Sequence, residues 1–256
     1  MENAKKIPIA LITGGSRGLG RSMALNLAER GVDVIFTYRA AASEANDVRT
    51  RIANLGRKAV ALPLDVTDSA SFDAFAKSLA AELGRSWDRK QFDYLVNNAG
   101  TSLHAGLVET TAAQLDDVYN VHFKAPFLLT QRLLPLIADG GRILNVSSVL
   151  ARTAIPGSAA YAAMKGAVEV LTRYMAKELG ARKITANVIA PSAIPTEFSG
   201  SAWRDNPKLG EMVAGWTALG RVGQPDDIGR AVAMLLSPES GWINGQRIEL
   251  SGGMGL

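Results

Sequence analysis

The sequence predicts an α/β protein in which one doubly wound parallel sheet of about seven strands carries helices on both faces. Short apolar runs alternate along the chain with segments of helical spacing, and these runs are apolar throughout. Strands of this kind are typical of parallel sheets that are covered on both sides. The 256 residues, 47% of them hydrophobic and 20% charged, suit a single domain over 1–256 with a full core.

The expected elements follow from the spacing of apolar residues and from the residues that start and stop helices. Strands are expected over 7–13, 32–37, 59–64, 92–96, 142–147, 184–189 and 246–250. Helices are expected over 18–30, 41–55, 69–83, 111–137, 159–179 and 225–236. We expect Ser69 to cap the third helix and Gly84 to end it, while the helix over 111–137 must accommodate Pro126 and Pro135.

The composition excludes several kinds of site. The chain has no cysteine and two histidines, so thiolate chemistry and zinc–cysteine sites are ruled out and no metal is expected. No apolar run approaches the ~18 residues of a membrane span and no signal peptide is visible, so we expect a cytoplasmic protein with no membrane partner. The net charge of +4 is scattered, without the aromatic-interleaved basic stripe of a nucleic-acid surface, so no nucleic-acid partner is expected.

Ser148, Tyr161 and Lys165 form a candidate group for proton transfer. A phenol has an unperturbed pKa near ~10, and a lysine four residues later lies on the same helical face, where its charge favours the phenolate. Ser148 follows a predicted buried strand, so its hydroxyl would lie at the carboxyl edge of the sheet beside the tyrosine. The alternative is a packed tyrosine beside a solvated lysine, because this spacing occurs by chance in many helices.

A glycine-rich loop, Thr13-Gly14-Gly15-Ser16-Arg17-Gly18-Leu19-Gly20, connects the first strand to its helix. Glycines there permit a tight turn and a close approach of the backbone to an anion at the helix N-terminus. The spacing is Gly-x-x-x-Gly-x-Gly and differs from the common dinucleotide pattern. A plain tight turn is the alternative interpretation.

These motifs together resemble the short-chain dehydrogenase/reductase family, in the compact type to which β-ketoacyl-[acyl carrier protein] reductases belong. The resemblance extends over nearly the whole chain and rests on the glycine loop, Asp65-Val66, Asn97-Asn98-Ala99-Gly100, Ser148, Tyr161-x-x-x-Lys165, and Asn244-Gly245-Gln246 to Gly252-Gly253. It implies a Rossmann-like NAD(P)-binding domain and an oxidoreductase that interconverts a carbonyl, of ketone or 3-oxoacyl type, and a secondary alcohol.

The resemblance also implies the cofactor residues, and the charges favour NADP(H) over NAD(H). Tyr38 stands where an acidic residue would bind the ribose 2′-hydroxyl of NAD, and Arg39 and Arg17 could instead pair with a 2′-phosphate. The alternative is that both arginines are solvated loop charges, and Asn97 could serve only to tie neighbouring strands. The expected cofactor-binding residues are Gly14, Ser16, Arg17, Gly18, Leu19, Gly20, Tyr38, Arg39, Asp65, Val66, Asn97, Ala99, Gly100, Tyr161, Lys165, Pro191, Ile194 and Thr196.

In the implied catalytic group, Tyr161 supplies the proton, Ser148 hydrogen-bonds the carbonyl, and Lys165 holds the nicotinamide ribose while lowering the tyrosine pKa. Ser148 lies thirteen residues before Tyr161, which is the family spacing, whereas the neighbouring Ser147 does not have this spacing. His122 occupies the place of the family's fourth catalytic residue, an asparagine. Its imidazole could hold a relay water for Lys165, or it could simply fill space.

Three further expectations concern the backbone, the substrate and assembly. Ser192 replaces a family glycine and restricts the backbone there. Residues 192–223 are expected to form a lid over a carbonyl on a small or medium apolar molecule, or to pack in a subunit contact, through Phe198, Trp203, Leu209, Met212 and Trp216.

The helix over 159–179 is apolar all round its first three turns, so one face is expected to cover the sheet and the other to pack against a partner subunit, in a homotetramer or homodimer. A non-catalytic nucleotide-binding regulator on the same fold is the rival function. Among enzymes, a reductase of carrier-bound ketoacyl groups competes with a reductase of free ketones.

Overall fold

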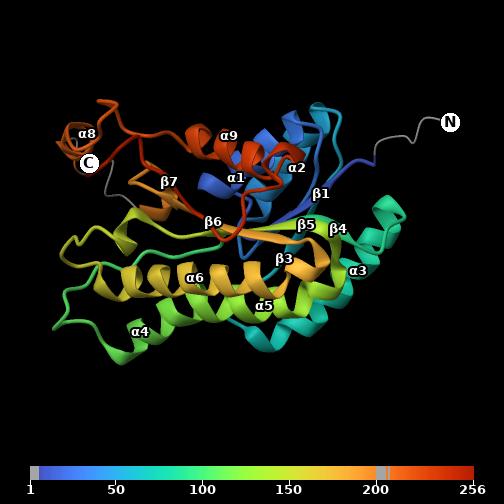
Figure 1. The fold of residues 1–256 in the computed structure, drawn as a ribbon, viewed down its shortest axis with the longest axis horizontal. Helices are drawn as coiled ribbons and strands as arrows, with labels where there is room; N and C mark the ends of the chain where they lie inside the picture. The colour runs from blue at the N-terminus through green and yellow to red at the C-terminus, as the bar shows by residue number, and fades with distance from the viewer. Residues whose placement is uncertain (1–5, 200–205, 207) are drawn as a thin grey trace.

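One parallel sheet organises the molecule (Figure 1). The computed structural model describes residues 6–199, 206 and 208–256, and these form seven strands in the order β3-β2-β1-β4-β5-β6-β7. All six strand pairs are parallel, and the strand order reverses between β1 and β4. The predicted fold class is confirmed. The strands are β1 (Ile9–Ile12), β2 (Asp33–Tyr38), β3 (Ala59–Pro63), β4 (Phe92–Asn97), β5 (Ile137–Val146), β6 (Thr185–Pro191) and β7 (Arg247–Leu250).

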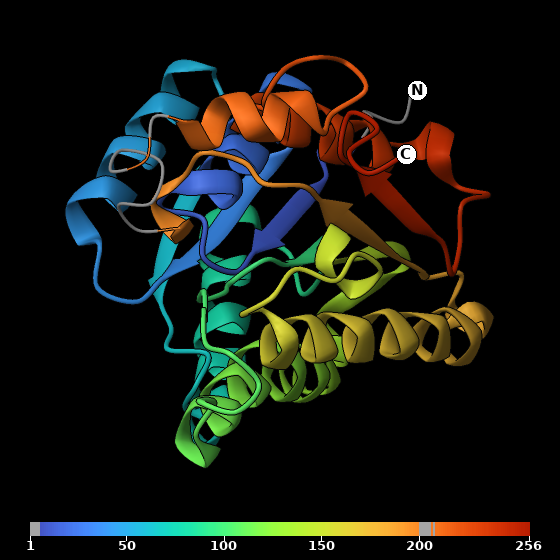
Figure 2. The same cartoon turned by 90° about the vertical axis from the view of Figure 1, so that its left-hand side faces the viewer.

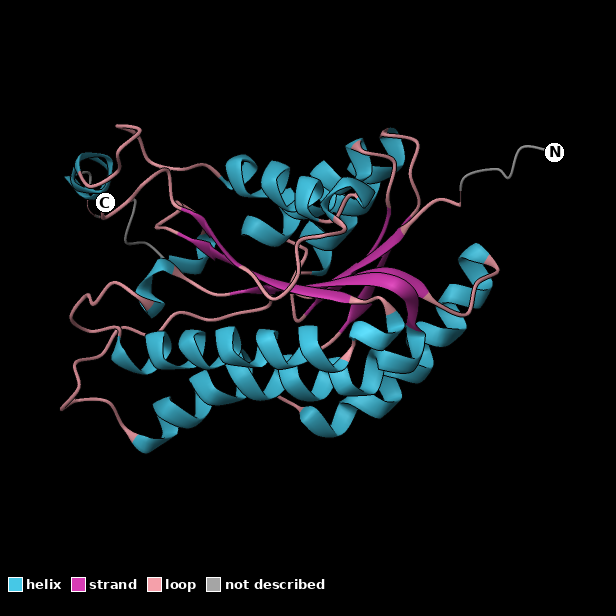
Figure 3. Ribbon diagram, viewed as in Figure 1, coloured by secondary structure: helices cyan, strands magenta, loops and turns pink. Residues whose placement is uncertain are grey.

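Helices cover both faces of the sheet (Figure 3). Side chains of β1 alternate between two apolar cores, with Ala10 and Ile12 in one and Ile9 and Leu11 in the other. The first core is closed by α1 (Gly18–Glu29), α2 (Ala42–Asn54) and α9 (Pro225–Leu235). On the other face lie α3 (Phe72–Trp87), α4 (Ala112–Tyr119), α5 (Ala125–Leu133) and α6 (Ala159–Glu178).

The expected start and stop of the third helix are wrong. Ser69 begins a short 3₁₀ turn that Asp68 caps by accepting a hydrogen bond from the Ala70 N–H, and α3 starts only at Phe72. The helix then continues through Gly84 and ends at Asp88, which adopts the left-handed conformation. Burial of Leu79 and Leu83 against the sheet outweighs the small helix penalty of one glycine, about 1 kcal/mol.

The expected continuous helix over 111–137 is also wrong. It is divided into α4, a π-helical turn at Asn120–Lys124, α5 and a 3₁₀ turn, and Ile137 already belongs to β5. Pro126 explains the division, because it has no N–H to bond to the carbonyl four residues earlier, at His122. Single π turns often occur at functional sites, and this one carries His122.

The stretch over 191–223, where no helix was expected, includes α8 (Lys208–Gly215). The C-terminal tail pairs with the segment after α8 through an isolated bridge between Thr217 and Met254 and through a hydrogen bond from the Leu219 N–H to the Gly252 carbonyl (Figure 2). Trp203 of the expected lid lies outside the described residues. Among the described helices, none has the length and apolar character needed to cross a bilayer.

Candidate active site

The glycine loop brings the N-terminus of α1 to the carboxyl edge of the sheet. Gly14 has a positive φ of 68°, and a Cβ on Gly20 would lie 2.1 Å from the Gly14 carbonyl oxygen, so neither position tolerates a side chain. Arg17 precedes the helix, and no side chain of the described residues caps it. The first N–H groups of α1 therefore remain available to an anion in the adjoining cavity.

Asn98 braces this loop against β4. Its side-chain amide donates to the carbonyl oxygens of Thr13, at 2.9 Å, and Gly14, at 3.1 Å. Asn97 points elsewhere, since its amide donates to Thr130 Oγ1 at 3.0 Å and Asn145 Oδ1 at 2.8 Å. Asn97 is not among the described residues that line the cavity, whereas Asn98 is.

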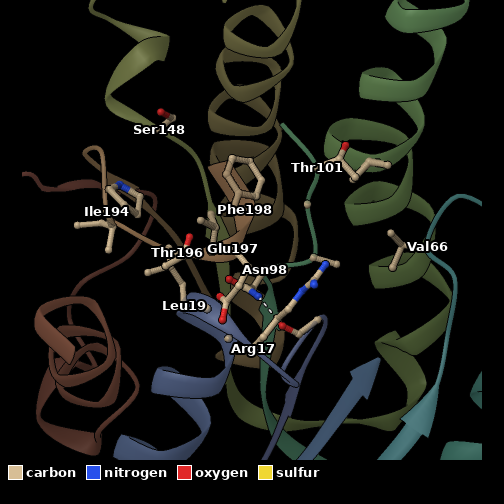
Figure 4. Close-up of a pocket in the computed structure, with 18 of the residues that line it drawn as sticks. Arg17, Leu19, Val66, Asn98, Thr101, Ser148, Ile194, Thr196, Glu197 and Phe198 are labelled. Atoms are coloured by element: carbon tan, nitrogen blue, oxygen red, sulfur yellow. Dashed lines mark hydrogen bonds between the residues drawn. The ribbon is translucent and has the colours of Figure 1, made fainter. Parts of the chain in front are cut away.

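The cavity has a volume of about 650 Å³, and the glycine loop, the end of β2, Ser148 and Tyr161 all line it. Figure 4 shows Arg17, Leu19 and Ser148 among the lining side chains. Its size is that of a small-molecule or cofactor site. Every expected cofactor residue other than Asn97 lines it, as do Ser148, Tyr161 and Lys165. The start of α1 has no side-chain cap, and the absence of a Cβ at Gly20 lets the helix lie close against the glycine loop. This arrangement fits the pyrophosphate of a dinucleotide.

The end of β2 presents cations and no acid to the cavity. Tyr38 is the last residue of the strand, and Arg39 and Arg17 both line this end of the cavity. Asp65 accepts two hydrogen bonds from Thr67, from the main-chain N–H at 2.9 Å and from Oγ1 at 2.8 Å. Burial tends to raise the pKa of Asp65, but the Thr67 hydrogen bonds and the charge of Arg39 outweigh it, so the pKa is lowered and Asp65 is a carboxylate at neutral pH.

Ser148, Tyr161 and Lys165 meet at the other end, as the spacing predicts. Burial raises the pKa of Tyr161, and a hydrogen bond with the Ser148 side chain opposes this. Burial lowers the pKa of Lys165 to about 7, and its Nζ donates to the Val146 carbonyl at 2.7 Å. Tyr161 is therefore protonated at neutral pH in the chain alone. The ammonium group of Lys165, which would favour the phenolate, is itself made less stable by burial.

His122 lies behind Tyr161, outside the cavity lining, with its side chain 1% exposed. The two rings meet edge to face with centroids 5.0 Å apart. His122 Nε2 lies 2.8 Å from the Thr101 carbonyl and 3.5 Å from the Thr101 N–H nitrogen. The shorter contact assigns the proton to Nε2, because a carbonyl only accepts.

The other ring nitrogen of His122, Nδ1, is buried and has no hydrogen-bond partner among the described residues. Burial, and then the charge of Lys165, lower the pKa of His122 well below its usual value against the opposing Thr101 hydrogen bond. The imidazole is therefore neutral at pH 7 and presents a bare acceptor next to Tyr161.

Several apolar residues, most of which the sequence did not single out, line the cavity. Val149, Ile155 and Met254 line it, and the ring of Phe198 lies 6.1 Å from that of Tyr161. Of these residues, only Phe198 was named from the sequence, as part of the expected lid. Met254 comes from the C-terminal tail and reaches the site through tertiary folding. Among the described residues, the non-glycine positions with positive φ are Asp88 and Lys183, so the backbone of Ser192 is not strained.

Comparison with known proteins agrees with this geometry. A family model described as enoyl-(acyl carrier protein) reductase matches residues 14–255. A short-chain dehydrogenase/reductase of Serratia marcescens superposes with a TM-score of 0.88 at 32% identity, over 97% of this chain and 98% of its own. The chain belongs to the short-chain dehydrogenase/reductase family. This short-chain dehydrogenase/reductase is an oxidoreductase, as the sequence predicts.

Two relatives carry more specific descriptions. A hydroxynaphthalene reductase-like protein, Arp2, of Metarhizium brunneum is 37% identical over 96% of this chain and 94% of its own length. The angucycline C-6 ketoreductase LanV, solved with bound NADP, has a TM-score of 0.91 and 35% identity, over 97% of this short-chain dehydrogenase/reductase and 95% of its own chain.

Proposed function

We propose that this enzyme is an NADPH-dependent carbonyl reductase that interconverts a ketone or 3-oxoacyl group and a secondary alcohol, with Tyr161 as general acid and base. The observation that carries the proposal is the convergence of Ser148, Tyr161 and Lys165 on one end of a cavity whose other end carries the uncapped α1 and two arginines. The relatives described as ketoreductases, one of them with bound NADP, support it.

The nicotinamide, when bound, supplies a hydride to the carbonyl carbon. Tyr161 then donates its proton to the carbonyl oxygen, and its raised pKa keeps that proton in place at neutral pH. Ser148 donates a hydrogen bond to the same oxygen as negative charge develops on it. Lys165, with a pKa of about 7, is able to gain and lose a proton near neutral pH and so return one toward the tyrosine.

The apolar surroundings of Tyr161 favour a flat, apolar ketone over a charged one. Phe198, Val149 and Ile155 offer no charge to the substrate, and Phe198 presents an aromatic ring at the cavity wall. Relatives described as reducing hydroxynaphthalenes and angucyclines are compatible with an aromatic ketone. A free ketone is therefore favoured over a carrier-bound acyl group.

A substrate panel tests the proposal. NADPH and NADH oxidation would be followed with bicyclic aromatic ketones, aliphatic ketones and 3-oxoacyl thioesters. We expect aromatic ketones to give the highest kcat/KM, with NADPH. An enzyme that binds NADPH but reduces no carbonyl would favour the rival function, a non-catalytic nucleotide-binding regulator.

His122 is proposed as the residue that holds a relay water beside Lys165. Its neutral imidazole has an unpartnered Nδ1 acceptor, which a water could satisfy. We expect His122→Phe, which keeps the ring and removes the acceptor, to lower kcat about tenfold and to change its pH profile, while His122→Asn retains more activity. If both variants keep the wild-type kcat and pH profile, the relay role is wrong and His122 only fills space.

Self-association is proposed to cover the outer face of α4, α5 and α6. Large apolar side chains are exposed along this surface, namely Leu115, Tyr119, Phe127, Val170 and Tyr174. Several large apolar side chains exposed on neighbouring helices favour an interaction site. We expect light scattering to report a homodimer or homotetramer, and a monomer at micromolar concentration would contradict this. Tyr174→Glu should weaken the assembly.

A further inference from the structure

A buried ion pair lies directly behind the catalytic serine and takes no part in the proposed proton transfer. Glu169 follows Lys165 by one turn of α6, and Arg247 begins β7, the edge strand of the sheet. Their side chains are 11% and 7% exposed, and Arg247 Nε donates to Glu169 Oε1 at 2.7 Å. Two segments far apart in the sequence are thereby joined beneath the active site.

Both partners of this pair also hold the segment that carries the catalytic serine. Glu169 Oε1 accepts a second hydrogen bond, from Ser147 Oγ at 2.7 Å, and Ser147 Oγ also lies 3.1 Å from the Lys165 carbonyl oxygen. Arg247 Nη2 donates to the carbonyl oxygen of Ser148 at 3.3 Å. The side chain of Ser147 is thus attached to α6, and the main chain of Ser148 to β7.

Stability alone is a weak reason for such a pair. Removing two charges from water costs several kcal/mol, and apolar replacements of similar volume are often as stable. A guanidinium with donors in fixed directions does, however, define the position of each acceptor. Arg247 also donates a hydrogen bond to Glu249. Its guanidinium group is therefore held by three acceptors, namely Glu169, Glu249 and the Ser148 carbonyl.

We propose that Glu169 and Arg247 are positioning residues that hold the Ser148 hydroxyl against the Tyr161 phenol. The proposal rests on the proposed function, because Ser148 matters only if Tyr161 transfers a proton. Loss of the pair would let the Ser147–Ser148 segment move, and the hydrogen bond between Ser148 and Tyr161 would weaken. That hydrogen bond opposes the rise in the Tyr161 pKa, so weakening it would raise this pKa further.

Arg247→Met tests the proposal against a matched control, Arg89→Met. Arg89 is 10% exposed, pairs with Asp93 at 2.8 Å and donates to the Ile7 carbonyl at 3.2 Å. It lies just before the central strand β4, at the amino-terminal ends of the strands and away from the cavity. Thermal unfolding, the Kd for NADPH, and kcat against pH for alcohol oxidation would be measured for both. We expect a similar loss of stability, but a kcat about tenfold lower only in Arg247→Met, with an unchanged Kd.

The pH profile separates positioning from a general structural role. Alcohol oxidation needs deprotonated Tyr161, so its rate rises with pH, and in Arg247→Met this rise should move to higher pH. Among the described residues, the titratable side chains in contact with the Tyr161 ring are Lys165 on α6 and His122 on the π turn. Glu197 is a further titratable residue of the cavity lining, and none of the three is changed. Ser147→Ala, a smaller change, should move kcat and the profile in the same directions.

Equal kcat and pH profiles in Arg247→Met and Arg89→Met would overturn the proposal. If Arg247→Met does not fold, a wild-type kcat and profile in Ser147→Ala would overturn it equally. Glu169→Gln keeps an acceptor for both Ser147 and Arg247 and should restore most of the activity that Glu169→Leu loses. A wild-type enzyme that reduces no ketone in the panel would instead contradict the proposed function itself.

Discussion

Replacement of Tyr161 by phenylalanine is expected to remove nearly all carbonyl reduction while NADPH binding persists. The phenol is the proposed general acid, and its raised pKa keeps it protonated through neutral pH. A positioned general acid contributes ~10²–10⁴-fold to a rate, so kcat should fall by at least two orders of magnitude. Phenylalanine keeps the edge-to-face contact with His122, so the fold should not change.

Single-turnover kinetics and fluorescence titration with NADPH would measure the two effects separately. Lys165 should keep its hydrogen bond to the Val146 carbonyl in this variant, so the Kd for NADPH should stay within about threefold of wild type. Ser148→Ala serves as a companion, and its kcat should fall as well. Turnover within tenfold of wild type in Tyr161→Phe would exclude Tyr161 as the proton donor.

Removal of Arg17 and Arg39 is expected to abolish the preference for NADPH over NADH. Both line the cavity, at the end proposed to hold the adenosine, and Tyr38 ends β2 where an NAD-selecting acid is expected. A hydrogen bond to a charged group contributes about 1.5–3 kcal/mol, so each arginine to alanine change should lower kcat/KM for NADPH by ~10–100-fold. NADH has no 2′-phosphate, and its kcat/KM should change little.

The control is Arg51→Ala, which removes an exposed cation of α2 that does not line the cavity among the described residues. It should leave both cofactors unaffected and so exclude an effect of net charge alone. A wild-type enzyme with a higher kcat/KM for NADH than for NADPH would contradict the preference from the outset. Equal losses with both cofactors in the double variant would show that the arginines bind the shared diphosphate.

The sequence predicted most of the fold because its signals are local. Each strand is an apolar run and each crossover has helical spacing, so the number of strands and their parallel direction needed no long-range information. The failures lie where tertiary contacts compete with local preference. Gly84 lies inside α3 because the neighbouring Leu79 and Leu83 are buried against the sheet. The helix expected before β5 is interrupted by a π turn just before Pro126.

The candidate site divides in the same way. The motif spacings and the family resemblance predicted that Gly14, Ser148, Tyr161 and Lys165 belong to one site, and all four line the same cavity. Only the tertiary structure decided that Asn98, rather than Asn97, faces the cavity and that Met254 reaches it. Likewise, no spacing rule relates Glu169 to Arg247, which are 78 residues apart and meet because β7 pairs with β6 beneath α6. Backbone patterns are encoded locally, whereas the partners of a buried polar side chain depend on which distant elements pack around it.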